Sequence, residues 1–207
     1  MARSKRITFL AELIKGYNVV LDIGSDHGYV LLEALQKGYI TYGIASDLRI
    51  EPLMQAEKNL KGYHAKTIQS DGFLNIHESF DLAIIAGMGA YLIGEILDHA
   101  PSFDVTYILQ ANDKPEVLRA YLKDHGFMIL DEYVIRDRFD YVVMKVKRGK
   151  MILEEKDLIL GPYLKDKPEA KPYYERKIQL LSKLIFQVDL KRRREIEDLI
   201  AIYQSVL

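Results

Sequence analysis

The chain has 207 residues, of which 49% are hydrophobic and 29% charged, so it can bury a sizeable core and is not intrinsically disordered. It contains no cysteine, which excludes a disulfide framework, thiolate zinc sites and a cysteine nucleophile. No run approaches the roughly 18 apolar residues of a membrane span, and the basic start lacks the apolar segment of a signal peptide. We therefore expect a cytoplasmic protein with no contact to a membrane.

The net charge of −1 conceals an uneven distribution. Residues 1–20 carry four basic side chains and one acidic side chain, a net charge of +3. Residues 21–149 carry 13 basic and 19 acidic side chains, a net −6, and residues 150–207 carry 12 against 10, a net +2. An acidic middle between basic ends suggests a polyanionic partner at the ends, although differences of this size are also common fluctuations.

Short β-branched runs alternate with helical stretches along most of the chain. The predicted elements, in chain order, are a strand at 18–23, a helix at 29–37, a strand at 41–46, a helix at 51–61, and strands at 65–69, 81–86, 106–110, 127–135 and 140–147. Strands that alternate with helices indicate βαβ units, so the sequence predicts an α/β fold with a mostly parallel sheet. The last two strands have too short a connection for a crossover helix, which predicts an antiparallel C-terminal edge.

A boundary near residue 150 divides the chain into two predicted domains, residues 1–150 and 151–207. From Tyr173 to Leu207 the chain contains neither glycine nor proline, and its apolar residues recur every three or four positions. The charged run KRRRE, which starts at Lys191, interrupts this pattern. We therefore expect two helices folded back as an antiparallel coiled-coil hairpin, with one long helix as the alternative.

The stretch DIGSDHGY at residues 22–29 directly follows the first predicted strand and opens a helix. Glycines allow a tight turn against a ligand, and a helix N-terminus offers free N–H groups. Asp26 stands where a dinucleotide fingerprint has its second glycine, which disfavours a dehydrogenase because a carboxylate opposes a pyrophosphate. The carboxylate suits a ligand with an amino group, such as the methionine part of S-adenosylmethionine. A plain turn without a ligand is the alternative.

Two further acidic residues follow the next predicted strands. Asp47 lies about 20 residues after the glycine turn, where an acid commonly binds ribose hydroxyls, but it could instead cap the next helix. Asp71, followed by Gly72, could reach the exocyclic amine of an adenine, but it could instead form an ordinary Asp-Gly turn. Acidic strand ends together with a glycine turn describe how class I methyltransferases bind S-adenosylmethionine, so we prefer the ligand-binding interpretation.

Small and polar residues follow the fourth and fifth strands. Ala86, Gly87 and Met88 follow the fourth strand, where small residues allow a methyl donor and its acceptor to approach closely. The run QAND at 110–113 ends the fifth strand and could add polar contacts to the same face. Both segments could equally be helix-entry turns.

Several of these segments resemble the TrmK family of bacterial tRNA (adenine-N1)-methyltransferases, which act at position 22, at the edge of the D-loop. The similar segments occur in order along nearly the whole chain: DIGSDHGY at 22–29, SD at 46–47, SDG at 70–72, IAGMGA at 85–90, LQAND at 109–113 and GPYL at 161–164. DIGSDH and IAGMG together are the most specific part. The resemblance implies a Rossmann-like class I methyltransferase domain followed by a C-terminal coiled coil, in agreement with the predicted elements.

The motifs and the resemblance together imply S-adenosyl-L-methionine as the cofactor. The residues expected to bind it are Asp22, Gly24, Ser25, His27, Asp47, Asp71, Gly72, Ala86, Gly87 and Met88. His27 could instead be only a hydrogen-bonded turn residue. No metal is expected, because the five histidines show no ligand spacing.

The N1 atom of adenine has a lone pair and can attack the sulfonium methyl group in line, so the enzyme must mainly align the reactants. Without cysteine, this transfer is expected to be direct. A carboxylate near the base could stabilise the developing positive charge or accept a proton, with Asp26 as the first candidate and Asp113 as the second. The target base is expected to be flipped out and held against Tyr29, whose alternative role is packing under the first helix.

A tRNA partner would give the basic ends a role. The side chains expected to contact phosphates are Arg3, Lys5, Arg6, Lys191, Arg192, Arg193 and Arg194. For the hairpin residues, a solvated helix face is the alternative. We expect a monomer. Two other functions remain open at this point: a methyltransferase with another acceptor (another RNA position, a small molecule or a protein), and a non-catalytic RNA- or protein-binding module.

Overall fold

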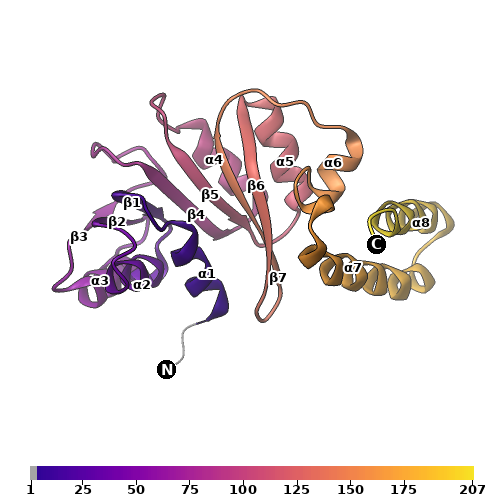
Figure 1. The fold of residues 1–207 in the computed structure, drawn as a ribbon, viewed down its shortest axis with the longest axis horizontal. Helices are drawn as coiled ribbons and strands as arrows, with labels where there is room; N and C mark the ends of the chain where they lie inside the picture. The colour runs from indigo at the N-terminus through magenta and orange to yellow at the C-terminus, as the bar shows by residue number, and fades with distance from the viewer. Residues whose placement is uncertain (1–3) are drawn as a thin grey trace.

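A seven-stranded sheet with the order β3-β2-β1-β4-β5-β7-β6 forms the centre of the computed structural model, which describes residues 4–207 (Figure 1). The strands are β1 (Val19–Ile23), β2 (Tyr42–Asp47), β3 (Ala65–Gln69), β4 (Leu82–Met88), β5 (Thr106–Ala111), β6 (Phe127–Arg136) and β7 (Asp140–Arg148). β1 to β5 are parallel, whereas β7 is antiparallel to both β5 and β6. The predicted α/β fold and its antiparallel C-terminal edge are thus confirmed. Arg3, expected to contact phosphate, lies outside the described residues.

Helices connect and flank the strands. The α-helices are α1 (Lys5–Leu13), α2 (Tyr29–Gln36), α3 (Ile50–Leu60), α4 (Ala90–Asp98), α5 (Pro115–Asp124), α6 (Glu155–Leu160), α7 (Lys171–Leu184) and α8 (Leu190–Gln204). Short 3-10 helices are η1 (Asp26–Gly28), η2 (Leu164–Asp166), η3 (Pro168–Ala170) and η4 (Ile185–Gln187). The predicted helices at 29–37 and 51–61 correspond to α2 and α3. Helix α1 has no counterpart among the predicted elements.

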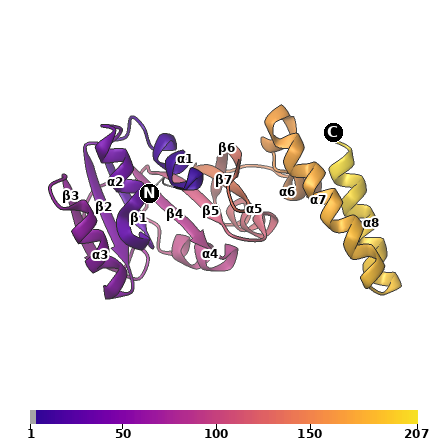
Figure 2. The same cartoon turned by 90° about the horizontal axis from the view of Figure 1, so that it is seen from below.

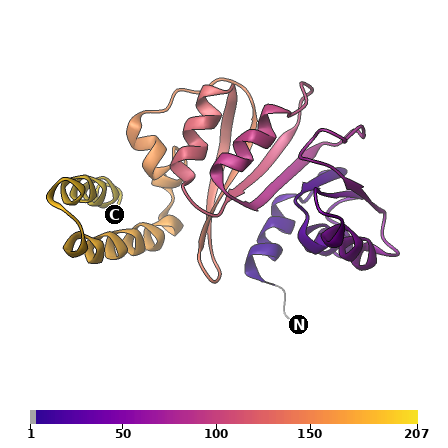
Figure 3. The ribbon, with the colours of Figure 1, turned by 180° about the vertical axis from the view of Figure 1, so that it is seen from behind.

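The central strands are buried on both faces, as their continuous apolar runs require. Leu21 packs in a cluster with α4 and α5, and its neighbour Val20 packs in another with α1, α2 and α3. Figures 1 and 3 show these two layers from opposite sides of the sheet. The strand order runs outward in both directions from β1 and β4, and ligands of open α/β sheets bind at the carboxyl ends of the strands beside such a reversal.

A buried ion pair joins the sheet to the segment that leads into the C-terminal helices. Arg119 on α5 and Glu132 on β6 are both fully buried, with 2.7 Å between Nε and Oε1. The backbone amides of Tyr163 and Leu164 donate to the second carboxylate oxygen of Glu132. Gly161 has a φ of +93°, and a Cβ there would lie 2.5 Å from Glu132 Oε2. The GPYL segment is therefore held against the sheet by a buried carboxylate.

The chain ends in two helices, so the alternative of one long helix is wrong. α7 is followed by η4 and by extended backbone at Val188 and Asp189, and the Asp189 side chain caps α8 by accepting from the Arg192 amide at 2.9 Å. α7 and α8 lie side by side and extend beyond the sheet (Figure 2). Coiled-coil packing and the domain division at residue 150 stay predictions. Among residues 4–207, no helix is long and apolar enough to cross a membrane.

Candidate active site

A hollow of about 480 Å³ lies at the carboxyl ends of β1, β2 and β4, within the size range of small-molecule sites, and is called the strand-end pocket below. Most of the predicted site residues line it: Asp22, Gly24, Ser25, Asp26, Tyr29, Asp47, Asp71, Gly72, Ala86, Gly87 and Met88. It is also lined by residues that were not predicted there, among them Arg6, Leu10, Leu48, Arg49, Ser70, Leu92 and Ile96. The fold thus gathers the ends of separate strands into one site.

The turn after β1 needs an unusual backbone. Gly24, His27 and Gly28 all have a positive φ, between +62° and +69°. A side chain at Gly24 would collide with Met88, and a Cβ at Gly28 would lie 3.2 Å from the Cβ of Ala56. Glycine is therefore required at both positions, for its backbone freedom and for the close approach of the neighbouring elements. The turn brings the N-terminus of α2 to the pocket.

Asp22 is the buried acid of the strand-end pocket. Its side chain accepts a hydrogen bond of 2.6 Å from Ser25 Oγ, and the residue is only 6% exposed. Burial raises the pKa of Asp22 to about 7, an increase that the Ser25 hydrogen bond and the charge of Arg6 limit and that Asp47 reinforces. A carboxyl group that is close to half protonated at neutral pH is ready to take a cationic partner, because a ligand ammonium stabilises its charged form.

Two further acids lie on the β2–β3 side of the pocket. Asp47 is buried, and its Oδ1 accepts from the backbone amide of Arg49 at 2.9 Å. Helix α3 begins at Ile50 with Arg49 as its N-cap, so the alternative role of Asp47 as the cap of this helix is wrong. Asp71 is exposed and lines the pocket together with Gly72, whose φ is +54°.

A chain of side-chain hydrogen bonds holds the opposite, β4–β5 side. Arg6 Nη1 donates to Gln110 Oε1 at 2.7 Å, and Gln110 Nε2 donates to Asn112 Oδ1 at 3.2 Å. Asn112 Nδ2 in turn donates to the carbonyl of Gly87 at 2.6 Å. Gly87 has a φ of +82°, and a Cβ there would lie 3.1 Å from Arg6 Nη1. Arg6, expected from the sequence to contact phosphate, thus places its guanidinium group inside the pocket.

Of the three candidate catalytic residues and His27, which was predicted to bind the cofactor, only two line the strand-end pocket. Asp26 and Tyr29 line the pocket, and both are exposed, Tyr29 by 39%. His27 and Asp113 are not part of this lining. The carbonyl of His27 accepts from Asn59 of α3 at 2.8 Å, and the His27 Nε2 atom lies 3.3 Å from Asp26 Oδ1. Asp26 and Tyr29 are therefore accessible from the pocket, and the roles of all four residues stay predictions.

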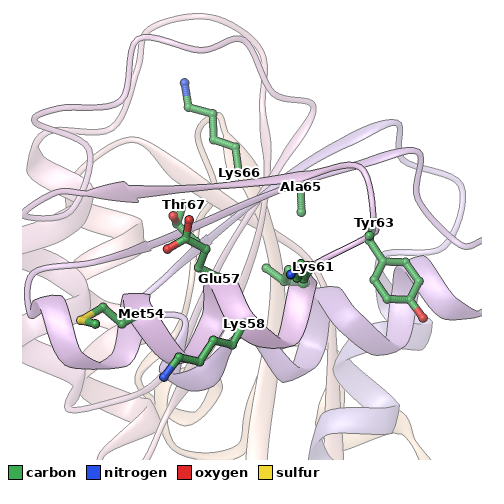
Figure 4. A pocket seen from close by; sticks show the side chains of 10 residues that line it. Met54, Glu57, Lys58, Lys61, Tyr63, Ala65, Lys66 and Thr67 are labelled. Atoms are coloured by element: carbon green, nitrogen blue, oxygen red, sulfur yellow. The ribbon is translucent and has the colours of Figure 1, made fainter.

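A second hollow of about 500 Å³ lies between α3 and β3 (Figure 4). It is lined by Lys58, Lys61, Lys66 and Tyr63, among others, and by none of the predicted site residues. Lys58 and Lys66 point in different directions in Figure 4, so they do not converge on one ligand atom. The strand-end pocket is therefore the candidate active site.

The strand-end pocket fits S-adenosylmethionine because its carboxyl groups can accept hydrogen bonds from the donor groups of this ligand. A buried carboxyl beside a glycine turn suits the cationic amino-acid part, and carboxylates at the ends of β2 and β3 suit ribose hydroxyls and an exocyclic amine. On the β4 side, the lack of a side chain at Gly87 allows the Arg6 guanidinium group to lie close to the backbone. Within the described residues, each of these groups opens onto the same hollow.

The sequence profile of the TrmK family, described as tRNA (adenine(22)-N(1))-methyltransferase, matches residues 20–204. The tRNA (adenine(22)-N(1))-methyltransferase of Bacillus subtilis is 30% identical over 183 residues, which cover 81% of this chain and 76% of that protein. Streptococcus pneumoniae Sp1610 in complex with S-adenosyl-L-methionine is 27% identical, with a TM-score of 0.86 over 100% of both chains. M. capricolum TrmK in complex with S-adenosyl-homocysteine is 26% identical, with a TM-score of 0.84 over 99% of this chain and 97% of that chain.

The fold and the pocket define a Rossmann-like class I methyltransferase that uses S-adenosylmethionine. Within this class, the chain belongs to the TrmK family of tRNA (adenine(22)-N(1))-methyltransferases. The family, the fold and the cofactor predicted from the sequence are therefore confirmed.

Proposed function

We propose that this chain transfers the methyl group of S-adenosylmethionine directly to N1 of adenine 22 in tRNA, inside the strand-end pocket. The observation that carries the proposal is the convergence of a buried acid, a glycine turn and a second buried acid on one hollow in a chain of the TrmK family. When bound, S-adenosylmethionine supplies an electrophilic methyl group on its sulfonium sulfur. The residues of the chain bind and orient the two substrates.

The residues on the cofactor side of the pocket are assigned by matching each carboxylate to a hydrogen-bond donor of S-adenosylmethionine. Asp22, held by Ser25, would accept a hydrogen bond from the ammonium group of the methionine part, and the backbone at Gly24 would lie against that part. Asp47 would accept from the ribose hydroxyls, and Asp71 from the adenine amine. This division follows the order of the strands, from β1 through β2 to β3.

The acceptor side is assigned to Asp26 and Tyr29. The N1 atom of adenine carries a lone pair, so no base has to remove a ring proton before attack. The methylated base is a cation, and the exposed carboxylate of Asp26 would stabilise the charge as it develops. The ring of Tyr29, at the start of α2, offers a surface on which the extruded base can stack. Asp113 remains a second candidate for the carboxylate.

Replacing Tyr29 by alanine is expected to lower kcat/KM for tRNA about tenfold, because stacking of one base on an aromatic ring contributes on the order of 1–3 kcal/mol. Tyr29→Phe should keep most of the activity, since it keeps the ring. Initial rates of methyl incorporation with both variants check this. A Tyr29→Ala protein with full turnover on tRNA would exclude the stacking role.

The basic start of α8 is proposed to bind tRNA phosphates. Lys191, Arg192 and Arg194 are exposed, and among the described residues neither Lys191 nor Arg194 has an acidic partner. Arg192 pairs with Glu195 at 2.6 Å, and Arg193 Nε donates to the Ile185 carbonyl at 3.4 Å. Cations in the first turn oppose the helix dipole, an unfavourable arrangement that a bound polyanion would reverse.

Reversing two of these charges, in Lys191→Glu/Arg194→Glu, is expected to weaken tRNA binding and to lower the salt dependence of log Kd by about two. S-adenosylmethionine affinity should not change, because neither residue lines the strand-end pocket. Filter binding at several salt concentrations measures the tRNA affinity and its salt dependence. The matched control is Lys58→Glu/Lys61→Glu at the second hollow. Unchanged affinity and slope in the α8 variant would exclude the hairpin as a phosphate clamp.

The proposed reaction is tested by incubating the purified full chain with labelled S-adenosylmethionine and an unmodified tRNA that carries adenine at position 22. The expected product is a single N1-methyladenine at this position, located by mass spectrometry of nuclease fragments, and no product when position 22 is guanine. Label in protein or metabolite pools without label in tRNA would establish another acceptor. Absence of S-adenosylmethionine binding in calorimetry would establish a non-catalytic module.

A further inference from the structure

The turn between β6 and β7, residues 137–139, lies beside Arg6 of α1, a residue that lines the strand-end pocket. β6 runs parallel to β5, so the turn is at the same edge of the sheet as the carboxyl ends that form the pocket. The side chain of Asp137 accepts a hydrogen bond of 3.3 Å from the backbone amide of Arg6, a residue of the pocket lining. Figures 1 and 3 show this hairpin projecting past the sheet between α1 and α7.

A series of aromatic and cation–π contacts connects the tip of this turn to Arg6. The Cζ atom of Arg138 lies 5.5 Å from the centre of the Phe139 ring, which contacts Tyr141 edge to face with 6.4 Å between ring centres. The Cζ atom of Arg6 lies 5.3 Å from the centre of the Tyr141 ring. Phe139 is 58% exposed, so its ring is not part of the hydrophobic core. Side-chain contacts therefore link the exposed Phe139 ring to Arg6 of the pocket lining.

Arg138 places a positive charge on the solvent-facing side of the turn, whereas the Asp137 side chain is directed to the Arg6 amide. The carboxylate of Asp140 accepts a hydrogen bond of 3.1 Å from Arg136 Nη1. It also accepts two from Arg176 of α7, of 2.8 Å from Nε and 2.6 Å from Nη2. Arg138 is exposed and has no acidic partner among residues 4–207. The bonds from Arg176 also tie the turn to α7, so it stands between the pocket and the helical hairpin.

We propose that Arg138 and Phe139 bind an unpaired nucleobase of the tRNA that neighbours the methylated adenine, with the base stacked on the Phe139 ring. This inference rests on the proposed function, because it assumes that tRNA enters the strand-end pocket. Proteins bind splayed-out bases of RNA loops by combining an exposed aromatic ring with a guanidinium group and a positive surface. Phe139 provides the exposed ring, and it is close in the turn to Asp137, whose side chain accepts a hydrogen bond from the Arg6 amide.

The test compares Phe139→Ser with Phe139→Trp in the full chain, using an in vitro transcribed tRNA with adenine at position 22. Phe139→Ser is expected to raise Kd and KM for tRNA about tenfold, the effect of losing one base–aromatic stack. Phe139→Trp should bind as the wild type does, since it keeps a ring. kcat at saturating tRNA and the affinity for S-adenosylmethionine should stay unchanged in both, because Phe139 does not line the pocket.

The matched control is Phe103→Ser. Phe103 is 46% exposed, and it precedes β5, so it lies at the amino ends of the parallel strands, away from the pocket. Tm values of all variants report whether a change is one of folding. Equal tRNA affinity of the wild type and Phe139→Ser, with an active wild type, would overturn this inference alone. An inactive wild type on tRNA would instead count against the proposed function.

Discussion

Asp22→Asn is expected to weaken S-adenosylmethionine binding by roughly 10- to 100-fold, the effect of losing a hydrogen bond to a charged group. Asparagine keeps the size of the side chain and an acceptor for Ser25, so the pocket retains its shape. Only the negative charge that is proposed to face the ammonium group is removed. Calorimetry with the full chain measures the change in Kd.

The same substitution is expected to stabilise the fold above neutral pH. Burial raises the pKa of Asp22 from 3.8 to about 7, so the folded state favours the protonated form more than the unfolded chain does. The wild type therefore loses stability as the pH rises from about 4 to about 7, by up to roughly 4 kcal/mol. Asparagine cannot ionise and avoids this loss, so its advantage is full at pH 8 and disappears towards pH 4.

Thermal unfolding of the wild type and Asp22→Asn at pH 5 and pH 8 shows whether the variant is more stable than the wild type at the higher pH. The exposed Asp71 of the same pocket provides the control, because Asp71→Asn removes a carboxylate that is not buried and should leave Tm unchanged. A lower Tm for Asp22→Asn than for the wild type at pH 8 would contradict the account of Asp22 as a buried acid with a raised pKa.

The pKa of Asp22 also predicts how cofactor binding depends on pH. The carboxyl group must be ionised to accept a hydrogen bond from the ammonium group, so affinity should fall as the pH drops below about 7. Binding at pH 6 should release a proton, which calorimetry in buffers of different ionisation enthalpy detects. The Asp22→Asn protein should lack this proton release. Proton release of equal size in the variant would assign the titration to another group.

Arg119→Met is expected to destabilise the protein by about 3–5 kcal/mol, because it leaves Glu132 charged and buried without its partner. Urea unfolding measures the loss. Arg119→Met/Glu132→Gln should recover a large part of it, since glutamine removes the charge and keeps an acceptor for the amides of Tyr163 and Leu164. The double variant separates the cost of an unpaired charge from the cost of lost packing.

A surface ion pair provides the comparison. Lys66 and Glu78 form a bridge at the exposed edge of the sheet, and Lys66→Met should leave the urea midpoint nearly unchanged. A loss from Arg119→Met as small as that from Lys66→Met would show that the buried pair does not hold the GPYL segment in place.

The strands and the acidic positions of the site were predictable from local sequence. Asp22, Asp47 and Asp71 each end or follow a run of strand-forming residues, and the carboxyl ends of parallel strands meet at one edge of the sheet. The periodicity of each segment and the turn residues between segments are sufficient for this prediction. The apolar spacing likewise predicted a helical C-terminus of two helices, but the break lies at residues 185–189, and the charged run that starts at Lys191 belongs to α8.

The partners of Arg6 and the position of His27 were not predictable in this way. Arg6 bonds to Gln110, which is 104 residues away, and no local pattern encodes a contact of that separation. His27 lies between two predicted pocket residues, yet it is not part of the pocket lining; its backbone is left-handed, with a φ of +62°, and its carbonyl accepts from Asn59 of α3. A conformation of this kind depends on the packing of the turn against α3.

By itself, the sequence determined the class of fold, the cofactor chemistry and the family, because these reside in short runs whose periodicity, glycines and carboxylates act locally. Only the tertiary structure decided the strand order, the place of α1 over the pocket and the approach of the β6–β7 turn to Arg6. These features arise from contacts between segments that are distant in the chain, such as β1 with β4 and Arg6 with Asp137, which form when buried faces of the sheet and helices pack together.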